Sequence, residues 1–321
     1  VHHPWQWVMK KARENVARYH QKPTSHAESW YGFYSAFLAA RYFPDKTLDK
    51  QLSDYFDQLY NKLHDPEKVE PLYFKTRIQN TSTTIGMLAD KYEAQGNLED
   101  LKKASKLADW MIRTSQRDDG AYYNHGTVYT SVIYIAKSVL ELAVLERKLG
   151  EQDPFWKDCA ERHFLSAKKA IDQLVASQGD FQTEGELTFE DGMISCSALQ
   201  IGMMGVLEKD AETRKYYTDA MLKILNSHDC LTQLRVPDGR RRQGTMRYWE
   251  AQYDVQMLPN MFNSPHGWSG WRAYATYYGY LLTGDEKWLE QTFNAMGAFA
   301  NLIDYKTGQL RWAFVVDPHL E

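Results

Sequence analysis

An uncharged stretch lies near the middle of the chain: Ser197-Ala198-Leu199-Gln200-Ile201-Gly202-Met203-Met204-Gly205. A helix that is apolar nearly all round is buried, so this stretch predicts a helix inside the protein. The segment that follows, residues 211–227, has a clear charged face and predicts a helix with one side in water. Together the two segments predict an inner helix paired with an outer one.

The same alternation runs through most of the chain, with turn signals at intervals of roughly 20 to 25 residues. Helices with a charged face are predicted at residues 4–20, 44–66, 98–116, 154–177, 211–227 and 286–303. Helices with few charges are predicted at residues 27–42, 74–95, 127–149, 192–208 and 268–282. Two concentric rings of antiparallel helices require such an alternation, because an ordinary bundle gives each helix one wet face. The sequence therefore predicts an all-α fold, an α/α toroid of five to six antiparallel helical hairpins.

The whole chain, residues 1–321, is predicted to form one toroid domain. Six outer helices are visible but only five inner ones, so the sixth inner helix is either absent or outside this sequence. Strand signals are scarce, and the best of them covers residues 309–316 at the end of the chain. This segment predicts the start of a β segment, and with it a β domain that follows the toroid.

Composition argues against several classes of function. Hydrophobic residues make up 43% of the chain and charged residues 25%, as in soluble globular proteins. The net charge of −4 leaves no basic field for a nucleic-acid backbone, and no apolar run approaches the roughly 18 residues that span a membrane. The three cysteines lie far apart without metal-ligand spacing, so no metal is expected. The first residues lack a signal peptide, but a processed N-terminus would look the same and would favour a periplasmic or secreted protein.

Aromatic residues make up 14% of the chain, and many of the Trp and Tyr residues fall in loops. Their rings are flat and carry a polar handle, so they stack well on the apolar C–H faces of sugars. In a two-ring toroid, the loops that enter the inner helices gather at one end, where the helix N-termini favour anionic groups. A sugar-binding site is therefore predicted at that end.

The first candidate loop, residues 117–126, precedes a predicted buried helix and holds Asp119, Tyr123 and His125. A carboxylate, a phenol and an imidazole in one loop are residue types of acid–base catalysis. A simpler interpretation is a polar turn in which an aspartate caps the next helix and glycine permits the turn geometry. That interpretation leaves His125 unexplained.

The second candidate loop, residues 184–192, ends with Glu190 and Asp191. Paired carboxylates are what glycoside hydrolysis needs, one as acid and one as base or nucleophile. Asp191 fits equally well as the cap of the helix that follows. The sequence leaves both interpretations open.

The longest loop is rich in arginine and leads to Arg247, Tyr248, Trp249 and Glu250. Long loops without structure of their own are usually functional or disordered. An arginine among aromatic residues suits a substrate carboxylate or sulfate, which a guanidinium grips with two parallel hydrogen bonds. The alternative is a basic loop that faces solvent.

The fourth loop, residues 262–272, carries His266, Trp268, Trp271 and Arg272 among small residues and a proline. Its glycines permit close approach of the backbone to a ligand, and the indole rings offer stacking faces. His266 is a candidate catalytic residue on this pattern. A histidine packed in the core is the alternative.

Two segments carry a resemblance to a known superfamily, Asp118-Asp119-Gly120-Ala121-Tyr122-Tyr123 and Gly267-Trp268-Ser269-Gly270-Trp271. They resemble the acid turn and the Gly/Trp-rich segment of the uronate-acting six-hairpin glycosidases, which include unsaturated glucuronyl and rhamnogalacturonyl hydrolases. Residues 181–318 are also similar to the family 154 glucuronidases. The resemblance implies a sugar-binding funnel with Asp119 as proton donor and Asp191 as the second carboxylate. His266 replaces the basic residue expected before the glycine and tryptophan.

The leading hypothesis is a glycoside hydrolase that releases a uronic acid from an oligosaccharide and needs no cofactor. Asp119, Glu190 or Asp191 would serve as general acid, while Arg247 and His266 would hold the substrate carboxylate. A polysaccharide lyase that acts by β-elimination with His and Tyr is the first alternative. A sugar epimerase of the same fold and a non-catalytic glycan-binding domain are the others.

Overall fold

The computed structural model describes residues 10, 13–14, 36–65, 67–72, 78–124, 126–131, 135–178, 191–229, 232, 269–300 and 306. After a helical segment at residues 36–42, its helices are α3 (Lys46–Leu63), α4 (Ile78–Gln95), α5 (Leu98–Ser115), α6 (Ile135–Gly150), α7 (Pro154–Ala176), α8 (Asp191–Leu207), α9 (Ala211–Ser227), α11 (Ser269–Thr283) and α12 (Glu286–Ala300). Two short strands, β1 (Tyr123–Asn124) and β2 (Thr127–Val128), form a hairpin before α6. None of the described helices is long and apolar enough to cross a membrane.

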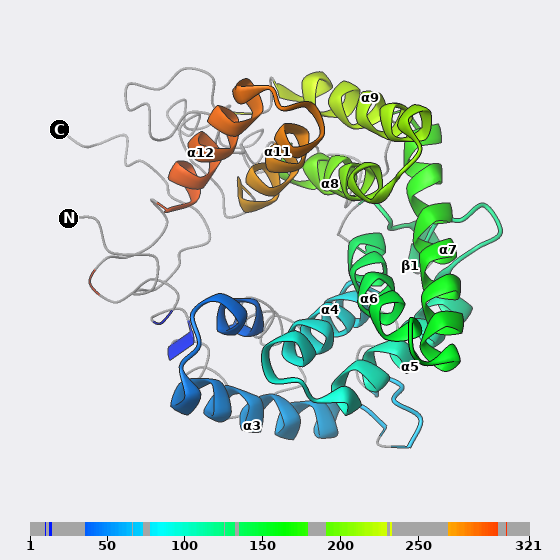
Figure 1. The fold of residues 1–321 in the computed structure, drawn as a ribbon, viewed down its shortest axis with the longest axis vertical. Coiled ribbons are helices and arrows are strands. Elements are labelled where there is room, and N and C mark those ends of the chain that lie inside the picture. Colours follow the sequence, from blue (N-terminus) through cyan, green and yellow to red (C-terminus); the bar gives the residue numbers. More distant parts are fainter. Residues whose placement is uncertain are drawn as a thin grey trace.

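The helices form two rings, as the alternation of charge predicts. Figure 1 shows α4, α6, α8 and α11 on the inside, with α3, α5, α7, α9 and α12 around them. Each inner helix packs against the outer helix that follows it in the chain, α4 on α5, α6 on α7, α8 on α9 and α11 on α12. Inner helices also pack on one another, α4 on α6 and α8 on α11. The prediction of an all-α fold, an α/α toroid of helical hairpins, is therefore confirmed.

Local signals explain where the outer helices begin. Each N-cap side chain accepts a hydrogen bond from a first-turn N–H, which satisfies one of the donors that a helix start leaves unpaired. The capped helices are α3 with Asp45, α5 with Asn97, α7 with Asp153 and α9 with Asp210. The turns into α5 and α12 contain Gly96 and Gly284, whose φ angles of +74° and +68° lie in the left-handed region that favours glycine.

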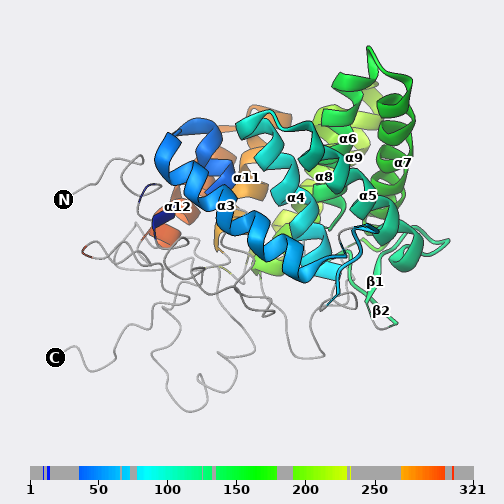
Figure 2. The ribbon, with the colours of Figure 1, turned by 90° about the horizontal axis from the view of Figure 1, so that it is seen from below.

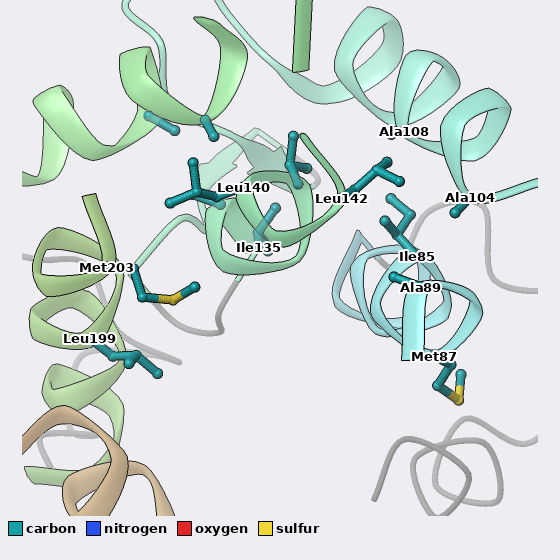
Figure 3. Close-up of a cluster of buried hydrophobic side chains, with 14 of the residues drawn as sticks. Ile85, Met87, Ala89, Ala104, Ala108, Ile135, Leu140, Leu142, Leu199 and Met203 are labelled. Atoms are coloured by element: carbon teal, nitrogen blue, oxygen red, sulfur yellow. The ribbon is translucent and has the colours of Figure 1, made fainter. Parts of the chain in front are cut away.

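The uncharged stretch at residues 197–205 lies in α8, between α9 and α11. A Cβ atom on Gly202 would lie 2.5 Å from Sδ of Met221 on α9 and 3.2 Å from Cβ of Tyr278 on α11. The absence of a side chain therefore lets three helices approach closely at this point. The apolar core continues through α4, α5 and α6, where Ile85, Ala104 and Leu142 belong to one buried cluster (Figure 3).

One predicted helix begins in the wrong place. The prediction put a helix at residues 127–149, but Thr127 and Val128 form β2, and α6 begins at Ile135. In the hairpin, Tyr123 pairs with Val128 and Asn124 with Thr127. Gly126 has a φ of +83°, which suits a tight hairpin turn, and the β-branched residues after it favour a strand.

Several predictions fall outside the described residues. They include most of the helix at residues 4–20, the first part of the helix at 27–42 and the strand at 309–316. The assignment of residues 1–321 to a single domain, with a β segment at the end, therefore stays a prediction.

Candidate active site and the cavity of the inner ring

Asp119 is exposed, and both of its carboxylate oxygens accept local hydrogen bonds. Oδ1 accepts from the backbone N–H of Ala121 at 3.0 Å, and Oδ2 accepts from Oη of Tyr123 at 3.0 Å. The second bond raises the pKa of Tyr123, because the carboxylate stabilises the protonated phenol. These contacts are those of a polar turn, and they hold the carboxylate in one orientation. The catalytic role of Asp119 stays a prediction.

The turn that carries Asp119 is anchored to the outer helix α7. Gly120 has a φ of +90°, and a Cβ atom there would lie 2.5 Å from the carbonyl oxygen of Lys169. Nε2 of Gln116 donates to the carbonyl oxygens of Gly120 at 2.7 Å and of Ser166 at 2.9 Å. These contacts fix the turn on the edge of the ring where α6 begins, and the hairpin projects from the same edge in Figure 2.

The remaining described candidates lie at the starts of inner helices. Asp191 is the first residue of α8, while Trp271, which is half-buried, and Arg272 belong to the first turn of α11. The Arg272 side chain is 0% exposed, and its Nη2 donates to Oδ1 of Asp229 at 2.6 Å and to Oε1 of Gln291 at 2.8 Å. These contacts link α11 to the end of α9 and to α12. They give Arg272 a structural part, and its contact with substrate stays a prediction.

The other candidates lie outside the described residues. They are His125, Glu190, Arg247, Tyr248, Trp249, Glu250, His266 and Trp268. Their roles in catalysis and substrate binding therefore stay predictions.

A cavity of about 340 Å³ lies inside the ring and was not expected from the sequence. Its walls come from the segment 36–42 and from α4, α6, α8 and α11. The charged residues that line it are Arg41, Asp90, Glu93, Lys137, Glu141 and Lys148.

Ion pairs connect the charged groups of the cavity. Nη1 of Arg41 lies 2.9 Å from Oδ1 of Asp90 and 2.6 Å from Oε2 of Glu93, and Nζ of Lys137 lies 2.7 Å from Oε2 of Glu141. Burial, together with the charge of Glu141, raises the pKa of Asp90 to about 7, although Lys137 and Arg41 act in the opposite direction. A carboxyl group poised between its two forms near neutral pH is a feature of binding and catalytic sites.

Solved structures of other proteins share this architecture, although comparisons of the sequence find no match. No protein-family model matches the chain, and no curated protein matches its sequence. Among solved structures, a polysaccharide lyase is similar with a TM-score of 0.67 at 15% identity, over 89% of this chain and 40% of the lyase. A D-mannose isomerase has a TM-score of 0.62 at 12% identity, over 98% of this chain and 92% of the isomerase. An unsaturated glucuronyl hydrolase from Streptococcus agalactiae has a TM-score of 0.54 at 12% identity, over 94% and 81%.

The chain has the six-hairpin glycosidase fold. It spans well under half of the polysaccharide lyase but most of the isomerase. The six-hairpin fold has two ends, and the Asp119 turn and the start of α8 at Asp191 belong to the end where inner helices begin.

A signal for the cavity is present in the sequence of the inner helices. Lys137 and Glu141 are one helical turn apart in the otherwise uncharged first half of α6, and Asp90 is among the buried residues of α4. Charges at such positions of inner helices are unfavourable unless they meet partners. The prediction of α4 and α6 as inner helices used the small number of their charged residues and not the positions of those residues.

Proposed function

We propose that the protein is a glycoside hydrolase that releases a uronic acid from oligosaccharides derived from polysaccharides. The observation that carries this proposal is the six-hairpin fold, shared over 94% of the chain with an unsaturated glucuronyl hydrolase. Support also comes from the sequence, because the residues that resemble the uronate-acting enzymes precede or begin inner helices α6, α8 and α11.

The proposed chemistry needs two carboxyl groups at one glycosidic bond. One lies next to the leaving oxygen, and the other lies next to the attacking water. Asp119, Glu190 or Asp191 donates the proton to the leaving oxygen, and a second member of this set activates water. Arg247 and His266 hold the substrate carboxylate. The aromatic side chains proposed to line the sugar are Tyr123, Tyr248, Trp249, Trp268 and Trp271, with His125 and Glu250 as polar contacts.

Matched variants of one turn test this proposal. The protein is incubated with a panel of uronate-containing oligosaccharides, and free uronic acid is separated and quantified. Asp119→Asn keeps the oxygen that accepts from Ala121 N–H, so the turn survives while the titratable group is lost. We expect it to lower the rate by at least about 100-fold, whereas Asp118→Asn, at the exposed neighbouring position, stays within about twofold.

A polysaccharide lyase is the second candidate, and the TM-score of 0.67 to a lyase supports it. β-Elimination would need a base such as His125, Tyr248 or His266, with Asn124 or Arg247 neutralising the substrate carboxylate. Its product is unsaturated and absorbs ultraviolet light, unlike the product of hydrolysis of a saturated substrate. A rise in absorbance during the assay would therefore replace the hydrolase with the lyase. No cleavage by either criterion would favour a sugar epimerase or a glycan-binding domain.

A further inference from the structure

The cavity of the inner ring lies toward the end opposite to the Asp119 turn. Its lining includes residues 89–93 of α4 and 203–207 of α8, which are the C-terminal parts of both helices. Tyr42, which is 65% exposed, and Lys148, which is also exposed, lie near the C-terminal ends of their helical segments. On α6 the lining extends from Lys137 in the first turn to Lys148 near the end of the helix. Among the residues that the structure describes, none of those proposed for the hydrolytic site lines the cavity.

The lining of this cavity has a polar part and an apolar part, here called the polar wall and the apolar wall. The polar wall consists of Arg41, Asp90, Glu93, Lys137 and Glu141, which come from the segment 36–42, α4 and α6. The apolar wall includes Val144 of α6 with Met203 and Val206 of α8. Met203 and Ala89, on opposite sides of the ring interior in Figure 3, both line the cavity.

Two tyrosines of α11 add flat surfaces to the lining. The ring centroids of Tyr274 and Tyr278 are 5.5 Å apart, and Nζ of Lys137 lies 5.6 Å from the ring centroid of Tyr274. Tyr274 is 36% exposed and is among the residues that line the cavity. A polar wall, an apolar wall and aromatic faces together match the two faces of a sugar ring and the hydroxyl groups on its rim.

The charges of the polar wall favour a neutral ligand. Arg41 is paired with Asp90 and Glu93, and Lys137 with Glu141, so a charged ligand would have to compete with existing ion pairs in a buried site. Hydroxyl groups both donate and accept, so they can join carboxylate oxygens and N–H donors without disturbing these pairs. Within the part of the chain that the structure describes, hydrogen bonds reach Asp90 only at Oδ1. Because the pKa of Asp90 is about 7, its carboxyl group is partly protonated near neutral pH, and the protonated form both donates and accepts hydrogen bonds.

We propose that this cavity binds a neutral monosaccharide, a hexose, at a second site of the protein. Its volume of about 340 Å³ is near the lower limit of roughly 300 Å³ for small-molecule sites, which suits one sugar ring and not an oligosaccharide chain. The proposal does not depend on the hydrolytic activity, because none of the described residues proposed for hydrolysis lines this cavity.

Titration calorimetry with matched sugars tests the site. The probes are D-glucose, D-galactose and D-mannose, with D-glucuronate and D-glucosamine as charged counterparts of glucose. Val144→Phe fills the cavity without removing an ion pair, and Leu165→Phe adds the same bulk on the exposed face of α7. Tyr274→Ala removes a stacking face.

We expect at least one neutral hexose to bind the wild type, and to bind at least about tenfold more tightly than glucuronate or glucosamine. Val144→Phe should weaken that binding at least about tenfold and Tyr274→Ala about three- to tenfold, while Leu165→Phe leaves it unchanged. Thermal unfolding establishes that each variant is folded, and Val206→Phe replaces Val144→Phe if the latter is not.

Three outcomes would overturn the proposal: no neutral hexose binds, binding survives the cavity-filling variants, or a charged sugar binds more tightly and is lost in those variants. Uronate release is measured on the same preparations. If the wild type releases uronate but binds no hexose, only the cavity proposal is contradicted. If the wild type binds a hexose but releases no uronate, only the proposed function is contradicted.

Discussion

Nδ1 of His163 on α7 lies 2.7 Å from Oε2 of Glu146 on α6, and both side chains are 0% exposed. Nε2 of the same imidazole lies 3.2 Å from Oδ1 of Asp109 on α5, so one buried histidine joins an inner helix to two outer helices. Burial disfavours the imidazolium, but the hydrogen bonds to Asp109 and Glu146 and their charges outweigh it and raise the pKa of His163 to about 8.

This pair predicts that alkaline pH destabilises the protein. The pKa of His163 is raised on folding, so its contribution is fully present below the unfolded value of about 6.5 and is lost as the pH rises through about 8. The expected loss is about 2 kcal/mol between pH of roughly 6 and 9. Urea unfolding at several pH values measures it, and in His163→Gln this part of the pH dependence should disappear. An identical pH profile in the variant would contradict the assignment.

A second buried ion pair predicts a large difference between two lysines. Nζ of Lys91 lies 2.8 Å from Oδ2 of Asp100, with side chains 2% and 1% exposed. Lys91→Met would leave Asp100 buried without this partner, and we expect it to lower the free energy of unfolding by about 3 to 5 kcal/mol. Lys50→Met removes the exposed ion pair with Asp54 and should cost less than about 1 kcal/mol. Equal effects in denaturant unfolding would argue against the buried pair.

Two glycines of the same loop allow the cost of a steric clash to be distinguished from the cost of backbone strain. Gly120 and Gly126 both have positive φ, but only a Cβ atom on Gly120 would meet another atom, the carbonyl oxygen of Lys169. Gly126→Ala should therefore cost about 1 kcal/mol, and Gly120→Ala about 2 to 4 kcal/mol. Gly120→Ala should also lower uronate release, because it displaces the turn of Asp119. If both variants unfold at the same denaturant concentration, the close packing on α7 is wrong.

Arg272 provides a test that separates stability from substrate binding. Its guanidinium joins Asp229 and Gln291 and is 0% exposed, so Arg272→Met should lower the free energy of unfolding by about 1 to 3 kcal/mol. A purely structural role leaves KM for the uronate substrate unchanged at temperatures where the variant is folded, whereas the contact with substrate that the sequence predicts requires KM to rise. A raised KM with unchanged stability would instead assign Arg272 to the substrate site.

Sequence patterns predicted individual helices well where capping signals are strong. Residues 211–227 were predicted as a helix and form α9, which Asp210 caps. The start of α6 was predicted too early, because the apolar character of residues 127–134 suggested a helix and the hairpin depends on the pairing of Tyr123 with Val128. Pairing of this kind is a contact between residues, and periodicity within one segment does not encode it.

The assignment of helices to inner and outer rings follows from the sequence alone. A buried helix carries few charged residues and a helix at the surface has a charged face, so each helix can be assigned from its own residues. The meeting of Asp90 with Arg41 and of His163 with Glu146 does not follow in the same way. The partners of each pair come from different helices, and their distances depend on how each helix is rotated and shifted against its neighbours. Side-chain packing across the whole ring sets that rotation, so only the tertiary structure determines the charged cavity and the buried histidine.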